Sequence, residues 1–125
     1  MTTDILSFNG ALTVEEVINI IRKRQPEAVE LYNMFVTEEE DELAGTFSLR
    51  ELIIAQPDTA INKIMKEEPV FLYDDQKVDD IAEIISKYNL LAIPVVDNEH
   101  QLQGMVVIDD VVEDLINERR TKKRK

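Results

Sequence analysis

Acidic side chains gather near the end of the chain at a spacing that suits metal binding. At separations of three and four residues, Asp110, Glu113 and Asp114 face the same side of a predicted helix. Carboxylate oxygens are the ligands that a hard cation such as Mg²⁺ prefers, usually by way of its waters. The pattern indicates a site for such a cation, and the full set of acids on this helix is Asp109, Asp110, Glu113, Asp114 and Glu118.

The helix dipole is a second explanation for part of this set. Acids in the first turn of a helix are stabilised by the partial positive charge of its exposed N–H groups. This accounts for Asp109 and Asp110, but Glu118 lies about two turns further along the chain. Under the metal interpretation, the carboxylates repel one another until a cation neutralises them.

Other residues of types that can take part in catalysis or bind a metal have no suitable partners in the sequence. His100 lies in a polar turn without a partner for a triad or a zinc site, and is expected to be a solvated loop residue. Gly45 and Gly104 do not form a P-loop, and Ser48 has no histidine nearby in the sequence. The chain has no cysteine, which excludes thiolate metal sites and cysteine nucleophiles. The sequence gives no positive sign of catalysis, and we do not expect an enzyme.

Charge and composition narrow the possible partners. Of 26 acidic and 14 basic residues, six basic ones lie within residues 119–125, so residues 1–118 carry a formal charge of −18. Such a body repels nucleic acid and attracts cations, although a merely solvated surface is the alternative explanation. The 44% hydrophobic content supports a packed core. No signal-peptide pattern occurs, and no apolar run approaches the roughly 20 residues of a membrane helix.

The elements that position these residues follow from periodicity and capping. In the first half we expect a strand over 5–8 and a helix after Thr13, with Thr13 and Glu16 as a capping box. Strands over 30–37 and 43–49 flank an acidic turn, and Ser48 and Glu51 form a capping box for a helix that stops before Pro57. The apolar face of the first helix comprises Val14, Val17, Ile18 and Ile21.

The second half repeats this order after a short linking helix over 58–65. Strands are expected over 69–73, 92–97 and 102–108, with helices over 77–88 and 109–120. The first of these helices turns Val78, Ile81, Ala82 and Ile85 inward. Val14 matches Val78 at an offset of 64, Phe35-Val36 matches Val95-Val96 at 60, and Gly45 matches Gly104 at 59. The expected fold is α/β, with two β-α-β-β-α repeats packed sheet to sheet, because each half is too small to bury its own sheet.

The repeated strand-to-helix joints, Gly45 to Leu52 and Gly104 to Val111, together with "IPVVD", resemble a tandem pair of CBS domains with pseudo-twofold symmetry. At a finer level, the chain resembles the cytosolic CBS pair of MgtE-family magnesium transporters. The matching sequence segments are "LTVEEVI", "FSLRELIIAQPDT", "INKIM" and "YNLLAIPVVD". The resemblance implies CBS repeat 1 over 1–57, a linker helix and repeat 2 over 58–118, and a basic tail over 119–125 that leads toward a membrane domain.

The same resemblance implies partners and a location. Family members add an acidic N-terminal domain and a membrane domain, and CBS pairs commonly form homodimers. The implied role is a regulatory module on the cytoplasmic face of the cell membrane that senses Mg²⁺ and gates transport, soluble when isolated. The alternatives are an adenine-nucleotide-sensing CBS module attached to an enzyme or a different transporter, and a purely structural dimerisation module.

The resemblance also implies site residues, which are assigned by their positions in the sequence. Asp79, Asp110, Glu113 and Glu118 fall on family positions that bind Mg²⁺, while Lys77 and Asn89 stand where the family can have acids. CBS modules bind adenosine nucleotides such as ATP or AMP at a Gly-x-x-Ser/Thr-x-x-Asp joint, in which glycine permits close approach, the hydroxyl receives phosphate and the acid holds the ribose. The matching residues are Tyr32 for adenine, Gly45, Ser48, Arg50 for phosphate, and Glu51. The second joint has Val107 in place of the hydroxyl.

Overall fold

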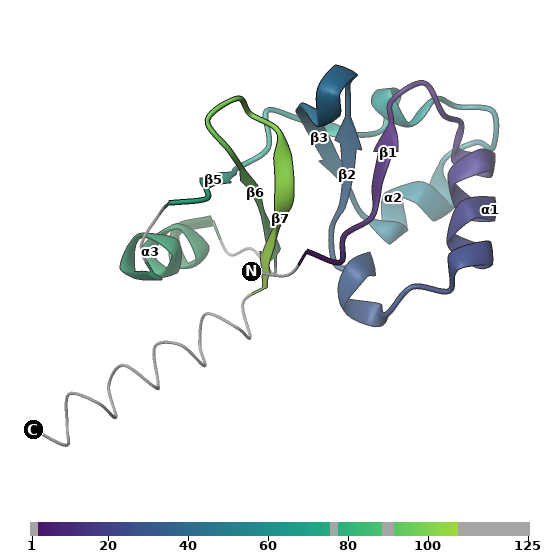
Figure 1. The fold of residues 1–125 in the computed structure, drawn as a ribbon. Helices are drawn as coiled ribbons and strands as arrows, with labels where there is room; N and C mark the ends of the chain where they lie inside the picture. Colours follow the sequence, from purple (N-terminus) through teal and green to yellow (C-terminus); the bar gives the residue numbers. More distant parts are fainter. Residues whose placement is uncertain (1–2, 76–77, 89–91, 108–125) are drawn as a thin grey trace, which may run out of the picture.

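The structure is a computed structural model that describes residues 3–75, 78–88 and 92–107 (Figure 1). Two sheets stand next to each other, with helices on their outer flanks: α1 on one side and α3 on the other. The first sheet has the order β1-β2-β3-β4, and its strands are Ser7–Asn9, Met34–Thr37, Leu43–Phe47 and Lys66–Glu67. The second has the order β5-β6-β7, with strands Leu72–Tyr73, Ala92–Val96 and Leu102–Val107.

The helices begin where capping residues predict. Thr13 and Glu16 form both bonds of a capping box at the start of α1 (Val14–Arg24). Ser48 caps α2 (Leu49–Ile54), and α3 spans Val78–Tyr88. Three short 3₁₀ turns lie between these elements: η1 (Ala28–Leu31), η2 (Glu39–Asp41) and η3 (Ile61–Lys63).

The two halves repeat one topology, so the predicted duplication is confirmed. In each half, a first strand runs parallel to a second, and a third is antiparallel to it. Both antiparallel pairs carry an irregularity at the same point, beside the pairs Val36–Gly45 and Val95–Gly104. The offset is therefore 59 in these strands, and the match of Phe35-Val36 with Val95-Val96 was wrong by one residue: the true counterpart is Pro94-Val95. In β1 and β5, Phe8 matches Leu72 at the predicted offset of 64.

Strand β4 crosses from one repeat to the sheet of the other. At the offset of 64, Lys66–Glu67 corresponds to the start of the chain and so begins the second repeat, yet it pairs with β3 of the first. A Cβ atom on Gly45 would lie 2.6 Å from Met65 Sδ and 2.8 Å from the Lys66 carbonyl oxygen. Only glycine allows this approach, and the first sheet is complete only when the second repeat is present.

A shared core joins the two sheets. Phe35 and Leu43 of the first sheet are buried in one cluster with four residues of the second, namely Ala92, Val96, Met105 and Val107. At one edge of this core, Glu42 forms an antiparallel bridge with Gln101, which is its own counterpart at the offset of 59. Two equivalent residues can pair in this way only near an axis that relates the repeats. The α/β, sheet-to-sheet tandem arrangement is confirmed.

Several predicted boundaries were wrong. The strand expected over 30–37 begins only at Met34, because Glu27 and Glu30 cap the 3₁₀ turn η1 in its place. The linker expected as a helix over 58–65 contains only η3, because its first part pairs with the start of α1: Val14 N donates to Thr59 O, and Thr13 forms an antiparallel bridge with Ala60. Residues 3–6 and 69–71 extend into β1 and β5 without strand pairing.

The predicted inward faces agree with the burial where side chains are described. Val14 and Val17 are buried and Ile18 and Ile21 pack against the same cluster. Ile81 and Ala82 pack inward, as does Ile84, which was not expected. The side chains of Val78 and Ile85, and the whole helix predicted over 109–120, lie outside what the structure describes.

Candidate functional site

The residues predicted to bind nucleotide meet at one end of the first sheet. Met34 at the start of β2 pairs with Phe47 at the end of β3, and Phe35 N donates to Leu6 O from the segment before β1. Tyr32 lies two residues before the start of β2, and Ser48 follows β3 directly. The fold therefore places Tyr32 and the joint from Ser48 to Glu51 at the same end of adjacent strands.

The joint itself is organised around the Ser48 hydroxyl. Ser48 Oγ accepts a hydrogen bond from Glu51 N at 3.3 Å and donates to Glu51 Oε1 at 3.0 Å. The predicted cap is thus formed, but the Glu51 carboxylate binds the hydroxyl, whereas a capping box would direct it to the backbone N–H of Ser48. Both side chains are half-buried, which fixes the carboxylate close to the point where α2 begins.

Two groups of the predicted site are open to solvent. Tyr32 is 45% exposed although it is a large aromatic side chain, and Arg50 is also exposed. An accessible ring can stack on a base, and an accessible guanidinium offers a planar fork of donors to phosphate. The arrangement supplies aromatic surface, a hydroxyl, a cation and a carboxylate within one short stretch of surface.

Gly45 has a structural role in addition to the nucleotide role predicted for it. The space beside its Cα is filled by Met65 and Lys66, so its small size is needed for the packing of β4. The sequence signal that could have revealed this is the repeat of Met1 at Met65, which marks the segment before β4 as the start of the second repeat.

The predicted metal ligands are mostly outside the described residues. Asp79 lies in the exposed first turn of α3, beside Asp80. Asp110, Glu113 and Glu118 fall within residues 108–125, which the structure does not describe. In the ranges it does describe, no three histidine or acidic side chains stand close enough to share a metal ion.

His100 is not the solvated loop residue that the sequence suggested. It is half-buried with a left-handed backbone (φ 65), and its ring packs edge to face against Phe71 at 4.8 Å. Its carbonyl oxygen accepts from Leu43 N, and the neighbouring Gln101 Nε2 donates to Glu40 O at 2.9 Å. His100 therefore belongs to the contact between the repeats, a role that an isolated turn in the sequence does not reveal.

The two interlocked units, β-α-β-β-α in the first repeat and β-α-β-β in the described part of the second, define a tandem-repeat α/β domain. The chain belongs to the CBS domain family, whose model matches residues 1–58 and 61–117. It is 36% identical over 113 residues to the magnesium transporter MgtE of Thermus thermophilus, an alignment that covers 90% of this chain and 25% of the relative. The structure resembles the cytosolic domain of the Mg²⁺ channel MgtE in complex with ATP, with a TM-score of 0.86 and 35% identity over 90% of this chain and 46% of that one.

Enzymes also carry related pairs. L-aspartate semialdehyde sulfurtransferase of Methanocaldococcus jannaschii is 30% identical over 118 residues, which are 89% of this chain and 22% of that enzyme. The chain thus spans about a quarter of the length of each of these two curated relatives. No helix within the described ranges is long and apolar enough to cross a membrane.

Proposed function

We propose that this CBS pair is the regulatory module of a magnesium transporter, where it senses Mg²⁺ and binds an adenine nucleotide to control ion transport. The observation that carries this proposal is the 36% identity to MgtE across 90% of the chain, and the hydrogen bond between Ser48 and Glu51 at the end of the first sheet supports it. The ATP complex of the related cytosolic domain supports the nucleotide part.

In the proposed nucleotide site, each side chain has one task. The exposed ring of Tyr32 stacks on adenine, and the Arg50 guanidinium binds phosphate. Glu51 accepts hydrogen bonds from the ribose hydroxyls with the oxygen that now accepts from Ser48 Oγ. The freed Ser48 hydroxyl then donates to phosphate, so nucleotide replaces an internal hydrogen bond without leaving a buried group unsatisfied. Gly45 holds β4 in place and, lacking a side chain, allows the backbone of the joint to approach the nucleotide.

Mg²⁺ sensing is proposed to be electrostatic. Residues 1–118 carry a formal −18, and the carboxylates of Asp110, Glu113 and Glu118 repel one another at low Mg²⁺. Binding of Mg²⁺ to a compact arrangement, which includes Asp79 and the acidic domain of the longer protein, shifts the population toward that arrangement. In the transporter, on the cytoplasmic face of the membrane, the compact state would close the pore.

A homodimer is part of the same proposal. The short helix α2 exposes three large apolar side chains, with Ile53 and Ile54 at 66% and 69% exposure beside Leu49 at 37%. Burial of this face against a second copy removes the apolar surface from water. Dimerisation would let two modules respond together to one ligand.

A melting experiment tests the magnesium part. We expect the melting temperature to rise more with Mg²⁺ than with Na⁺ at matched ionic strength, because a ligand that binds only the folded state stabilises it by about 2.7 kcal/mol at a hundred times its dissociation constant. The double variant Asp110→Asn with Glu113→Gln removes two charges while keeping the side-chain sizes, and should raise the stability without Mg²⁺ and shrink the Mg²⁺-specific increment. An unchanged increment in this variant would place the metal elsewhere.

The rival function is a nucleotide sensor attached to an enzyme or a different transporter, which the similarity to an enzyme-borne pair favours. Nucleotide binding without any divalent-specific stabilisation, even when the chain is rejoined to an acidic N-terminal domain, would favour this rival. Loss of both responses would leave a structural dimerisation module.

A further inference from the structure

Strand β4 brings a basic side chain from the start of the second repeat to the joint of the first. Lys66 pairs with Thr46 of β3, which lies two residues before Ser48. The other residue of β4, Glu67, pairs further from the joint. Lys66 is exposed to solvent, and within the part of the chain that the structure describes it forms no ion pair. Its ammonium group is therefore available to an anion bound at the joint.

The geometry of the sheet puts Lys66 and Ser48 on the same face. Residues directly opposite each other in an antiparallel pair share a face, as do residues two apart along an extended strand. Lys66 is opposite Thr46, and Ser48 follows Thr46 by two residues with an extended backbone (φ −104, ψ 163). From the usual spacing between strands and rise per residue, the Cα atoms of Lys66 and Ser48 lie about 8 Å apart. The flexible four-carbon stem of lysine spans most of this distance, so one phosphate group can contact both side chains.

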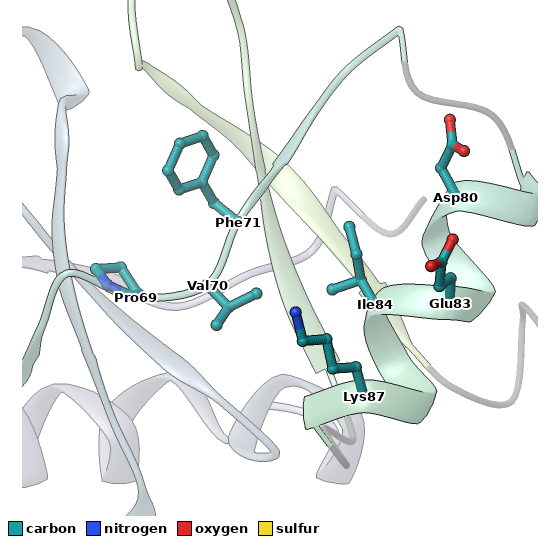
Figure 2. A pocket seen from close by; sticks show the side chains of 7 residues that line it. All are labelled: Pro69, Val70, Phe71, Asp80, Glu83, Ile84 and Lys87. Carbon is teal, nitrogen blue, oxygen red and sulfur yellow. The ribbon is translucent and has the colours of Figure 1, made fainter.

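The backbone that carries Lys66 is attached to the core of the second repeat. After β4 the chain passes through Pro69 and Val70 and lies beside Ile84 of α3 (Figure 2). Val70 and Ile84 both pack against the cluster that contains Leu72 of β5. A ligand that contacts the joint and Lys66 therefore contacts both repeats, and its affinity depends on how the two repeats are packed.

We propose that Lys66 is a further phosphate ligand of the nucleotide site, an inference that rests on the nucleotide function proposed above. Tyr32 and Glu51 hold the adenosine part, whereas Arg50 from the first repeat and Lys66 from the second hold phosphate groups. In a body with a formal charge of −18 over residues 1–118, these two cations offset the repulsion of a phosphate chain. ATP can engage both cations, and adenosine engages neither.

Calorimetric titration of the whole chain with ATP and with adenosine tests the role of Lys66. Lys66→Ala should weaken ATP by about three- to fivefold, the scale of one solvent-exposed ion pair, and leave adenosine unchanged. Lys66→Arg keeps the charge and should bind ATP about as tightly as the parent. The matched control is Lys63→Ala, which removes the same charge from an exposed position in η3 and should change neither affinity.

The outcomes separate the role of Lys66 from the nucleotide site itself. A lysine on an edge strand also discourages pairing with other sheets, and that role alone predicts equal ATP affinities for Lys66→Ala and Lys63→Ala. Such equality, while Arg50→Ala weakens ATP, would overturn the role of Lys66 and leave the nucleotide site intact. Equal weakening of ATP and adenosine by Lys66→Ala would also overturn it. A parent chain that binds no ATP would overturn both the nucleotide site and the role of Lys66.

Discussion

Replacement of Gly45 by alanine tests the interlocking of the two repeats. The new Cβ would lie 2.6 Å from Met65 Sδ, 2.9 Å from Met65 Cγ and 2.8 Å from the Lys66 carbonyl oxygen. The methionine side chain is flexible and can move, but the carbonyl belongs to β4, whose residues Lys66 and Glu67 pair with Thr46 and Gly45. The overlap can therefore be relieved only by displacement of β4.

Two opposing effects determine how much Gly45→Ala changes the free energy of unfolding. Gly45 does not have a positive φ, so alanine is allowed there and gains about 0.4–1 kcal/mol from the lower entropy of the unfolded chain. Overpacking of a tight site costs about 1–3 kcal/mol. The overlap prevails, and we expect a net loss of about 1–2 kcal/mol, or a fall of roughly 5 °C in melting temperature for a chain of this size.

Differential scanning calorimetry of four variants checks this reasoning: Gly45→Ala, Gly10→Ala, Met65→Ala and the double variant of Gly45→Ala with Met65→Ala. Gly45→Ala should lower the melting temperature more than Gly10→Ala, for which the nearest atom to the new Cβ is Asn62 Cβ at 3.0 Å. In a Met65→Ala background the cost of Gly45→Ala should shrink but persist, because the Lys66 carbonyl remains. A Gly45→Ala protein that melts with the parent would refute the assigned role of Gly45 and the tight packing of β4.

Three further predictions address the shared core, the joint and the dimer. Met105 is fully buried between the repeats, so Met105→Ala should cost about 2–5 kcal/mol and keep a single calorimetric transition; two separate transitions would contradict a common core. Ser48→Ala should cost about 1 kcal/mol in urea unfolding through the lost cap, whereas Ser48→Thr should cost clearly less, and equal losses would argue against capping. Ile53→Asp on the exposed face of α2 should convert the proposed dimer to a monomer, measured by sedimentation velocity, with little change in the stability of the monomer. A sedimentation coefficient that does not change would place the interface elsewhere.

The fold was predictable because the sequence contains two repeats with the same order of strands and helices. The capping box of Thr13 and Glu16, the alternating strands and the repeated glycines gave the element order and the pairing of two units. Strand limits were less predictable, since local capping by Glu27 and Glu30 overrode the strand pattern before Met34. The pairing of β4, at the start of the second repeat, with β3 of the first repeat was not predictable from local patterns, because it depends on contacts between segments that are distant in the sequence.

The candidate site was predictable in its residues but not in its internal geometry. The positions of Tyr32, Ser48, Arg50 and Glu51 at one end of the sheet follow from strand order alone. The bond from Ser48 Oγ to Glu51 Oε1 could not be predicted, because a glutamate three residues into a helix can reach either the backbone or the capping hydroxyl. The role of His100 between the repeats was missed because it depends on Phe71 and Leu43, which lie far from it in the sequence.

Calorimetric titration with ATP and with adenosine tests the proposed regulatory site most directly. Arg50→Ala should weaken ATP clearly more than adenosine, since the guanidinium fork is matched to phosphate, while Tyr32→Ala should weaken both by about 1 kcal/mol through lost stacking. Arg22→Ala, at an exposed position in the last turn of α1, is the matched control and should change neither. Equal weakening of ATP and adenosine by Arg50→Ala, or binding of ATP that no substitution at the joint affects, would contradict a nucleotide site at the end of the first sheet.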